Sequence, residues 1–313
     1  MHISSPLILL LILSLIGTLG SGLSAQEAKQ PEAEKEEKLS NLSAYISVVA
    51  LGPVPQRKYK MPDEKDLEKI AGEDGDGRPD RKGQAKPDAG AGAIPILLPT
   101  VSGAIPPAAL YYKSPKPKEG NPWARLRVGY NNATSITPVP AGITLKLHQL
   151  DREENSEYKT YMTVPPMVPA TQVILFLTPD GTGSRPWMKT PKISTLNIRS
   201  EALRDKNIIV RNFSSKAVTV KIASGEPEVL NGGQRKSFNV EQKGSFTQIA
   251  AMIATSRQPL INTVVRLPAK TLTVLAFYDA DPVTNGGKSV GVFRTTVSKL
   301  PPEVLNKPNV PSQ

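Results

Sequence analysis

The residues that most often carry catalysis are scarce in this chain. Its 313 residues include no cysteine and two histidines, His2 and His148. A serine triad would need His148 as its base, and the sequence has no G-x-S-x-G turn to supply the nucleophile. A zinc site would need further histidines or cysteines, and nucleotide-binding glycine loops are also missing from the sequence. The sequence therefore predicts no catalytic residue, no metal site and no cofactor.

Carboxylate pairs are the remaining route to catalysis, because a glycosidase needs one acid and one base or nucleophile across a cleft. The acidic candidates all occur where turns usually place such residues: Glu153, Glu154, Glu157, Glu226, Glu228, Asp279 and Asp281. The segment 74–80 resembles a calcium loop, which needs oxygen ligands at alternate positions. Pro79 and the missing terminal glutamate depart from that pattern, so we interpret the segment as an acidic, glycine-rich turn.

Two tryptophans and two arginines are the candidate ligand-binding residues. Trp123 and Trp187 each follow a proline, and exposed tryptophans on a β-sandwich can stack on sugar rings. The alternative is that each indole fills the end of a lobe or the space between lobes, because large aromatic side chains prefer burial. In the alternating run 123–130, Arg125 and Arg127 lie on the face opposite Leu126, and they could hold an anionic ligand.

Positive charge is concentrated in the later part of the chain. The net charge is +11, yet residues 26–92 contain 12 Lys/Arg against 14 Asp/Glu, whereas residues 93–313 contain 27 against 14. A basic folded region attracts anionic partners such as acidic glycans, lipopolysaccharide, anionic lipid or nucleic acid. The alternative is that these cations are the solvated faces of amphipathic strands, because no window holds a dense basic run.

The N-terminal residues predict export. Residues 7–16 form an apolar run interrupted by Ser14, which is the length of a signal peptide and too short for a membrane span. We expect cleavage after Ala25, a charged spacer over 26–40, no membrane span after cleavage, and a periplasmic or secreted location. Export separates the protein from intracellular nucleic acid, so no nucleic-acid partner is predicted.

Short alternating strands dominate the remainder of the chain. The 30 prolines and 23 glycines suit many turns, and runs such as 123–130 and 143–150 alternate apolar and polar residues. We predict an all-β protein of two tandem antiparallel β-sandwich lobes. The first spans 41–182 and carries a mobile insertion at 53–92, the second spans 183–298, and a proline-rich tail covers 299–313. The segment 246–254 fits a helix by composition, but a buried strand suits its neighbours better.

The stretch 207–222 is the clearest strand pair in the second lobe. Val218, Val220 and Ile222 alternate with polar residues, Arg211 is predicted to face water, and a polar turn at 214–216 predicts a hairpin. A second turn is predicted at 231–233.

The sequences IIVRNFSSKAVTVKI and LNGGQRKSF, within 206–240, resemble a recurring pattern of bacterial immunoglobulin-like sandwiches. In that pattern an I-x-V-x-N strand leads into a V-x-V strand, and an Asn-Gly or Pro-Gly turn precedes a polar–aromatic strand. The whole chain is similar to exported bacterial proteins with two β-sandwich lobes behind a signal peptide and a spacer. The resemblance implies a location in the cell envelope and implies no activity.

Two functions remain open. The first is a non-catalytic envelope scaffold or binding module that engages a protein or an anionic polysaccharide through basic strand faces. The second is a carbohydrate-binding or carbohydrate-active protein that uses exposed tryptophans or a carboxylate pair. A chaperone-like role, in which an exposed edge strand pairs with a client, is a third possibility.

Overall fold

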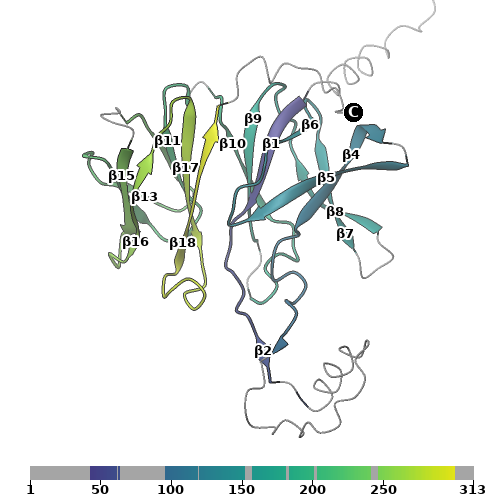
Figure 1. Cartoon of the computed structure of the whole chain (residues 1–313), viewed down its shortest axis with the longest axis horizontal. Coiled ribbons are helices and arrows are strands. Elements are labelled where there is room, and N and C mark those ends of the chain that lie inside the picture. The colour runs from purple at the N-terminus through teal and green to yellow at the C-terminus, as the bar shows by residue number, and fades with distance from the viewer. Residues whose placement is uncertain are drawn as a thin grey trace, which may run out of the picture.

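The computed structural model shows an all-β protein (Figure 1). It describes residues 43–61, 63, 96–118, 120–151, 157–180, 183–200, 203–240 and 246–299. The predicted signal peptide, charged spacer and tail from residue 300 onward lie outside these residues, as does most of the insertion predicted at 53–92, including its calcium-like turn. Across the described ranges, no helix is long and apolar enough to cross a membrane.

An eight-stranded sheet is built from the first ten strands except β2 and β3. Seven of them follow the order β10 (Lys192–Asn197), β9 (Gln172–Thr178), β1 (Ser43–Ala50), β5 (Asn121–Tyr130), β4 (Ala109–Lys118), β7 (Leu145–Asp151) and β8 (Glu157–Val164). The eighth, β6 (Thr137–Pro140), shares one edge of β1 with β5. Because β1 runs parallel to both β5 and β9, the sheet is mixed, and the prediction of purely antiparallel sheets is wrong.

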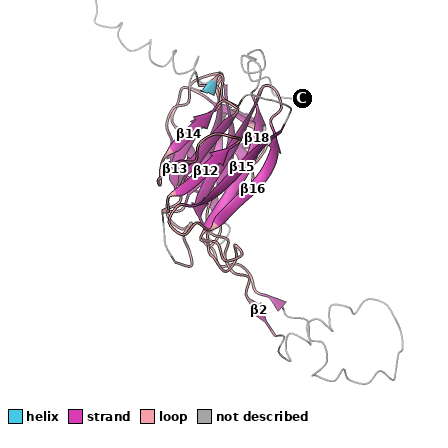
Figure 2. Cartoon of the chain, turned by 90° about the vertical axis from the view of Figure 1, so that its left-hand side faces the viewer, coloured by secondary structure: helices cyan, strands magenta, loops and turns pink. Residues whose placement is uncertain are grey.

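Two four-stranded sheets hold the later strands. One has the order β14 (Arg235–Phe238), β11 (Ile208–Asn212), β17 (Thr271–Asp279) and β18 (Val290–Ser298), with β11 parallel to β17. The other has the order β13 (Glu228–Leu230), β12 (Val218–Ile222), β15 (Phe246–Ile253) and β16 (Pro259–Arg266). β15 confirms the strand expected at 246–254. A small ribbon of β2 (Tyr59–Lys60) and β3 (Ile96–Leu97) projects away from these sheets (Figures 1 and 2).

Three buried clusters lie between these layers. The eight-stranded sheet encloses one, which includes Leu126 and Leu147, and the two four-stranded sheets share a second, which includes Val220. The third lies between β1 and β9 of the large sheet and the outer face of β17. Leu275 of β17 therefore faces the second cluster while Val274 faces the third. Burial on both faces explains why 271–279 is apolar almost throughout.

The run 207–222 does not form the predicted hairpin. β11 and β12 lie in different sheets, so the chain crosses from one layer to the next between them. Asn212 holds this crossing, because its buried amide donates to the carbonyls of Lys216 and Leu230 at 2.7 and 2.9 Å. Its Oδ1 accepts the backbone N–H of Ser214 at 3.0 Å. The alternation of β12 is confirmed, since Val218, Val220 and Ile222 are buried.

The turn predicted at 231–233 is also a crossing between these two sheets. It connects β13 to β14, and the backbone N–H of Gly233 donates to the Asn212 carbonyl at 2.7 Å. Gly233 has a φ of +81°, and a Cβ on Gly232 would lie 2.7 Å from the Ser214 carbonyl oxygen. The two crossings therefore pack directly on each other and require glycine at both positions.

Two further predictions about the second lobe need correction. Arg211 was expected to face water, but its guanidinium carbon lies 4.9 Å from the ring centroid of Phe213, and Nη1 donates to the Thr195 carbonyl at 3.1 Å. The cation sits there because the outer face of β11 is covered by the eight-stranded sheet. β10 falls within the span assigned to the second lobe, yet it pairs with β9. Extended alternation cannot show which sheet a strand joins.

Candidate binding face

Four neighbouring strands, β5, β4, β7 and β8, present an open sheet face. Their inward residues, including Leu126 and Leu147, are buried in the enclosed cluster, so the alternate residues point outward. Cross-strand register then brings outward residues together. Trp123 lies opposite Lys113, and Tyr111 lies opposite both Arg125 on one side and His148 on the other. The β7–β8 pairing shifts register between Leu147 and His148, because Tyr161 of β8 is the extra residue of a bulge.

The outward aromatic side chains form one continuous cluster. The ring of Trp123 stacks on Tyr158 with centroids 4.2 Å apart and planes at 20°, and it meets His148 edge-on at 4.8 Å. Tyr111 packs edge-on against Tyr158 at 5.1 Å. All four side chains are half-buried, so each one supports its neighbours while part of its ring remains in water. Such ring pairs stabilise by about 0.5–1.5 kcal/mol each beyond the area they bury.

Cations surround this cluster. The Lys113 Nζ lies 5.7 Å from the centroid of the Trp123 ring, within the range of a cation–π interaction. Arg125, Arg127 and Lys146 are exposed on the same four strands, and within the described part of the chain none of them forms an ion pair. Their charge is therefore available to a ligand.

His148 is the titratable group of the face. Partial burial, with the positive charges of Lys113 and Lys146, holds its pKa below the ordinary value of 6.5. Its Nδ1 lies 3.4 Å from the Thr160 hydroxyl. A neutral imidazole at pH 7 lets the ring pack against Trp123 without adding another cation to a face that already carries several.

The other predicted tryptophan, Trp187, lies in the core. It is 2% exposed, its backbone N–H donates to the Gly103 carbonyl at 2.9 Å, and its own carbonyl accepts the Tyr161 hydroxyl at 3.1 Å. Its ring meets Tyr130 edge-on at 6.2 Å. The structure therefore brings Trp123, Arg125 and Arg127 onto one face and places Trp187 where no ligand reaches its ring.

The carboxylates do not gather at this face. Asp279 accepts hydrogen bonds from the backbone and hydroxyl of Ser215, Asp281 caps the turn at Val283, and Glu228 pairs with Lys236 at 3.2 Å. Glu226 is exposed in the connection between β12 and β13, and Glu157 is exposed at the start of β8, while Glu153 and Glu154 lie outside the described residues. Across the described ranges no group of three or more His, Asp or Glu side chains could hold a metal ion.

Four members of the face, Tyr111, Lys113, Lys146 and Tyr158, were not singled out as binding residues from the sequence. The signal was present in the run 110–113, whose alternation puts Tyr111 and Lys113 on the side opposite buried Leu110 and Tyr112. It was missed because only register shows that they adjoin Trp123.

No protein-family model matches the chain, and no curated protein sequence is similar to it.

Proposed function

We propose that this chain is a non-catalytic, exported binding module for an anionic polysaccharide. The binding site is the aromatic–cationic face, which we define as Tyr111, Lys113, Trp123, Arg125, Arg127, Lys146, His148 and Tyr158. The observation that carries the proposal is the stack of Trp123 on Tyr158 with unpaired cations on the same strands. Export rests on the signal peptide predicted at residues 1–25.

The chemistry of the face suits a charged sugar chain. Aromatic side chains offer apolar edges and faces to the C–H groups of a sugar ring, and Arg forms paired hydrogen bonds with carboxylate, sulfate or phosphate. Arg125 and Arg127 are two residues apart on β5, so their Cα atoms are separated by about 7 Å along the strand. An open, flat row of this kind suits successive charges on an extended polymer better than one small anion.

The same proposal includes the finer architecture. The two four-stranded sheets share one buried cluster, which supports a β-sandwich for the later part of the chain. The eight-stranded sheet encloses a cluster of its own, which supports a separate first lobe. We interpret both lobes as immunoglobulin-like sandwiches that act as a scaffold and leave the aromatic–cationic face open to a ligand.

A direct binding measurement tests this function. Protein from residue 26 onward is titrated with polygalacturonate, with dextran sulfate and with neutral dextran by isothermal calorimetry at two salt concentrations. We expect binding of the anionic polymers that weakens as salt screens the cations, and no binding of dextran. Equal binding of neutral and anionic polymers, or no binding of either anionic polymer at low salt, would overturn the proposal.

Matched double variants locate the site. Arg125→Ala with Arg127→Ala removes two cations from the aromatic–cationic face, whereas Lys221→Ala with Arg266→Ala removes two exposed cations from the sheet that contains β12 and β16. We expect the first pair to weaken binding about tenfold or more, because charge-assisted hydrogen bonds contribute about 1.5–3 kcal/mol each. The second pair should change it about twofold at most. Equal losses would show non-specific attraction to net charge.

A further inference from the structure

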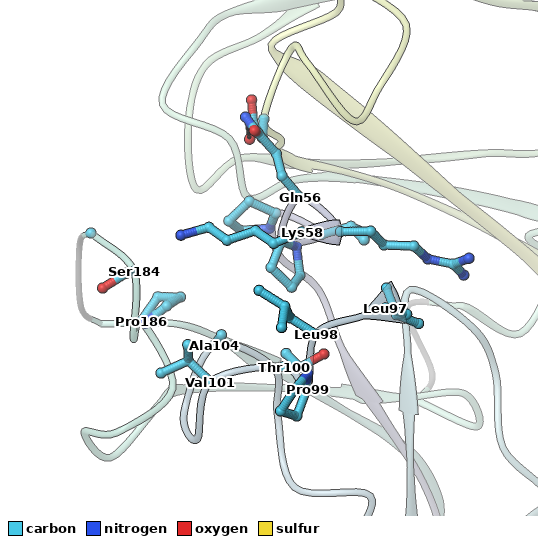
Figure 3. Close-up of a pocket in the computed structure, with 16 residues that line it drawn as sticks. Gln56, Lys58, Leu97, Leu98, Pro99, Thr100, Val101, Ala104, Ser184 and Pro186 are labelled. Atoms are coloured by element: carbon cyan, nitrogen blue, oxygen red, sulfur yellow. Dashed lines mark hydrogen bonds between the residues drawn. The ribbon is translucent and has the colours of Figure 1, made fainter. Parts of the chain in front are cut away.

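A groove lies at the base of the projecting β2–β3 ribbon, and none of its lining residues belongs to the aromatic–cationic face. It has a volume of about 590 Å³. One wall is residues 53–58, the other is residues 97–101, and Ala104, Pro186 and Asp281 complete it. Figure 3 shows Leu98 between Lys58 on one side and Val101 and Ala104 on the other.

The groove is lined mainly by apolar side chains, and several of these are partly exposed to water. Val54, Leu97 and Val101 are 47%, 52% and 44% exposed, and Leu98 is 38% exposed. Four large apolar side chains gathered on one concave surface differ from the scattered exposed residues that any protein has. Their arrangement indicates a surface that another apolar segment covers.

The walls are held in place, so the groove is ready to receive a ligand. The Thr284 hydroxyl donates to the Val54 carbonyl at 2.9 Å, and the Gln56 amide donates to Asp281 at 3.4 Å. At the start of this wall the Tyr130 hydroxyl donates to the Pro53 carbonyl. Tyr130 at the end of β5 and two residues that follow β17, Asp281 and Thr284, therefore hold this wall in place.

The second wall is joined to the first where β2 pairs with β3. The Leu98 N–H donates to the Lys58 carbonyl at 2.9 Å, and Tyr59 lies opposite Leu97. This pairing holds residues 97–101 beside residues 53–58.

The charges at the rim of the groove indicate which kind of segment it binds. Arg57 and Lys58 are exposed at the rim, whereas the one carboxylate in the lining, Asp281, accepts hydrogen bonds from Gln56 and from the Val283 backbone. We propose that the groove binds an extended peptide segment of a partner protein in which apolar residues alternate with acidic ones, so that the apolar residues contact Val54, Leu98 and Val101 and the acidic residues face Arg57 and Lys58. This site does not depend on the polysaccharide function, and the two proposals are tested separately.

A labelled synthetic peptide tests the inference. The probe is a fluorescent heptapeptide in which leucine or valine alternates with aspartate, and the comparison peptide has lysine in place of each aspartate. Fluorescence anisotropy with the protein from residue 26 onward should show saturable binding of the acidic peptide, at least about tenfold tighter than that of the basic one. No saturable binding of the acidic peptide at millimolar protein, or equal binding of both, would overturn the inference.

Two variants separate the parts of the site. Leu98→Glu places a charge in the groove and should weaken acidic-peptide binding at least about tenfold. Arg57→Ala with Lys58→Ala should reduce the preference for the acidic peptide over the basic one. Binding and preference that survive both variants would overturn the inference, because they would place the peptide elsewhere.

Two controls accompany these variants. Thermal melting checks that each variant folds, and if Leu98→Glu does not, the pair Arg57→Ala and Lys58→Ala still decides the outcome. The pair Arg125→Ala and Arg127→Ala should leave peptide binding unchanged. If that pair abolishes peptide binding, the peptide occupies the aromatic–cationic face and the groove assignment is wrong.

Discussion

Two open sheet faces of this molecule obey the same alternation but differ in how their side chains meet. On the aromatic–cationic face, Trp123 and Tyr158 stack at 4.2 Å. On the outer face of the β13-β12-β15-β16 sheet, which Figure 2 shows toward the viewer, Phe246 is 66% exposed and Val264 is 62% exposed. No ring contact involving Phe246 occurs among the residues that the structure describes. Exposed aromatic residues therefore indicate a site only where neighbouring strands gather them.

The comparison depends on the strands of both open faces having one buried and one exposed side, and substitutions in β12 test this most severely. Val220 is fully buried between the two four-stranded sheets, whereas the next side chain, Lys221, is exposed. Val220→Asp should cost several kcal/mol, about 4 or more, because it buries an unpaired charge. Lys221→Asp should cost less than about 1 kcal/mol. Urea unfolding measures both, and similar midpoints would refute the assignment of faces.

The crossing between the two four-stranded sheets should give the next largest effect. Asn212→Ala removes the amide that donates to the Lys216 and Leu230 carbonyls and the oxygen that accepts from Ser214. Leaving these buried groups without partners should cost about 3 kcal/mol. Ser215→Ala, in the same segment but at an exposed hydroxyl bonded to Asp279, is the matched control and should cost under about 1 kcal/mol. Equal losses of stability in urea would mean that Asn212 does not hold the crossing.

A smaller effect is expected when an aromatic ring is removed from each of the two open faces. Trp123→Ala removes a stacked ring and an edge contact, so it should destabilise the protein by about 1–2 kcal/mol. Phe246→Ala removes a ring that is 66% exposed and should change stability by less than about 0.5 kcal/mol. Chemical denaturation of the two variants distinguishes them. If Phe246→Ala costs as much as Trp123→Ala, the distinction between the faces fails.

The sequence predicted the faces of individual strands better than the relations between strands. Leu126 and Val220 were expected to be buried, and they are, because a period of two records only which side of a strand meets a core. β11 and β12 were expected to pair, and they lie in different sheets. A short polar connection suits both a hairpin and a crossing, and only the buried amide of Asn212 distinguishes the two.

The tryptophans show the same limit at the candidate site. Trp123 and Trp187 both follow a proline, yet one is half-buried on an open face and the other is 2% exposed. Residues distant in the chain determine how exposed each tryptophan is: Tyr158 and His148 lie beside Trp123, and Tyr130 and Tyr161 lie beside Trp187. Local sequence identifies such residues as candidates, but strand register decides whether they form a site.

The smallest effect concerns proton binding at the aromatic–cationic face. His148 has a pKa below 6.5 because of burial and the nearby Lys113 and Lys146, so the unfolded chain takes up this proton first as the pH falls. Stability from this group is therefore complete above pH 6.5, decreases as the pH falls through 6.5, and levels off below the folded-state pKa. His148→Gln should flatten this part of the melting profile between pH 7.5 and 5.5.

Nuclear magnetic resonance of protein from residue 26 onward gives the clearest measurement, since His148 is then the one histidine in the chain. Its ring protons should titrate below pH 6.5, whereas a midpoint at or above 6.5 would contradict the packing against Trp123 and the two lysines. Bound polygalacturonate should raise the midpoint, because carboxylates near the ring favour its charged form. A midpoint that does not move when the polymer is bound would place the polymer away from this face, and would remove the functional difference between the two open faces.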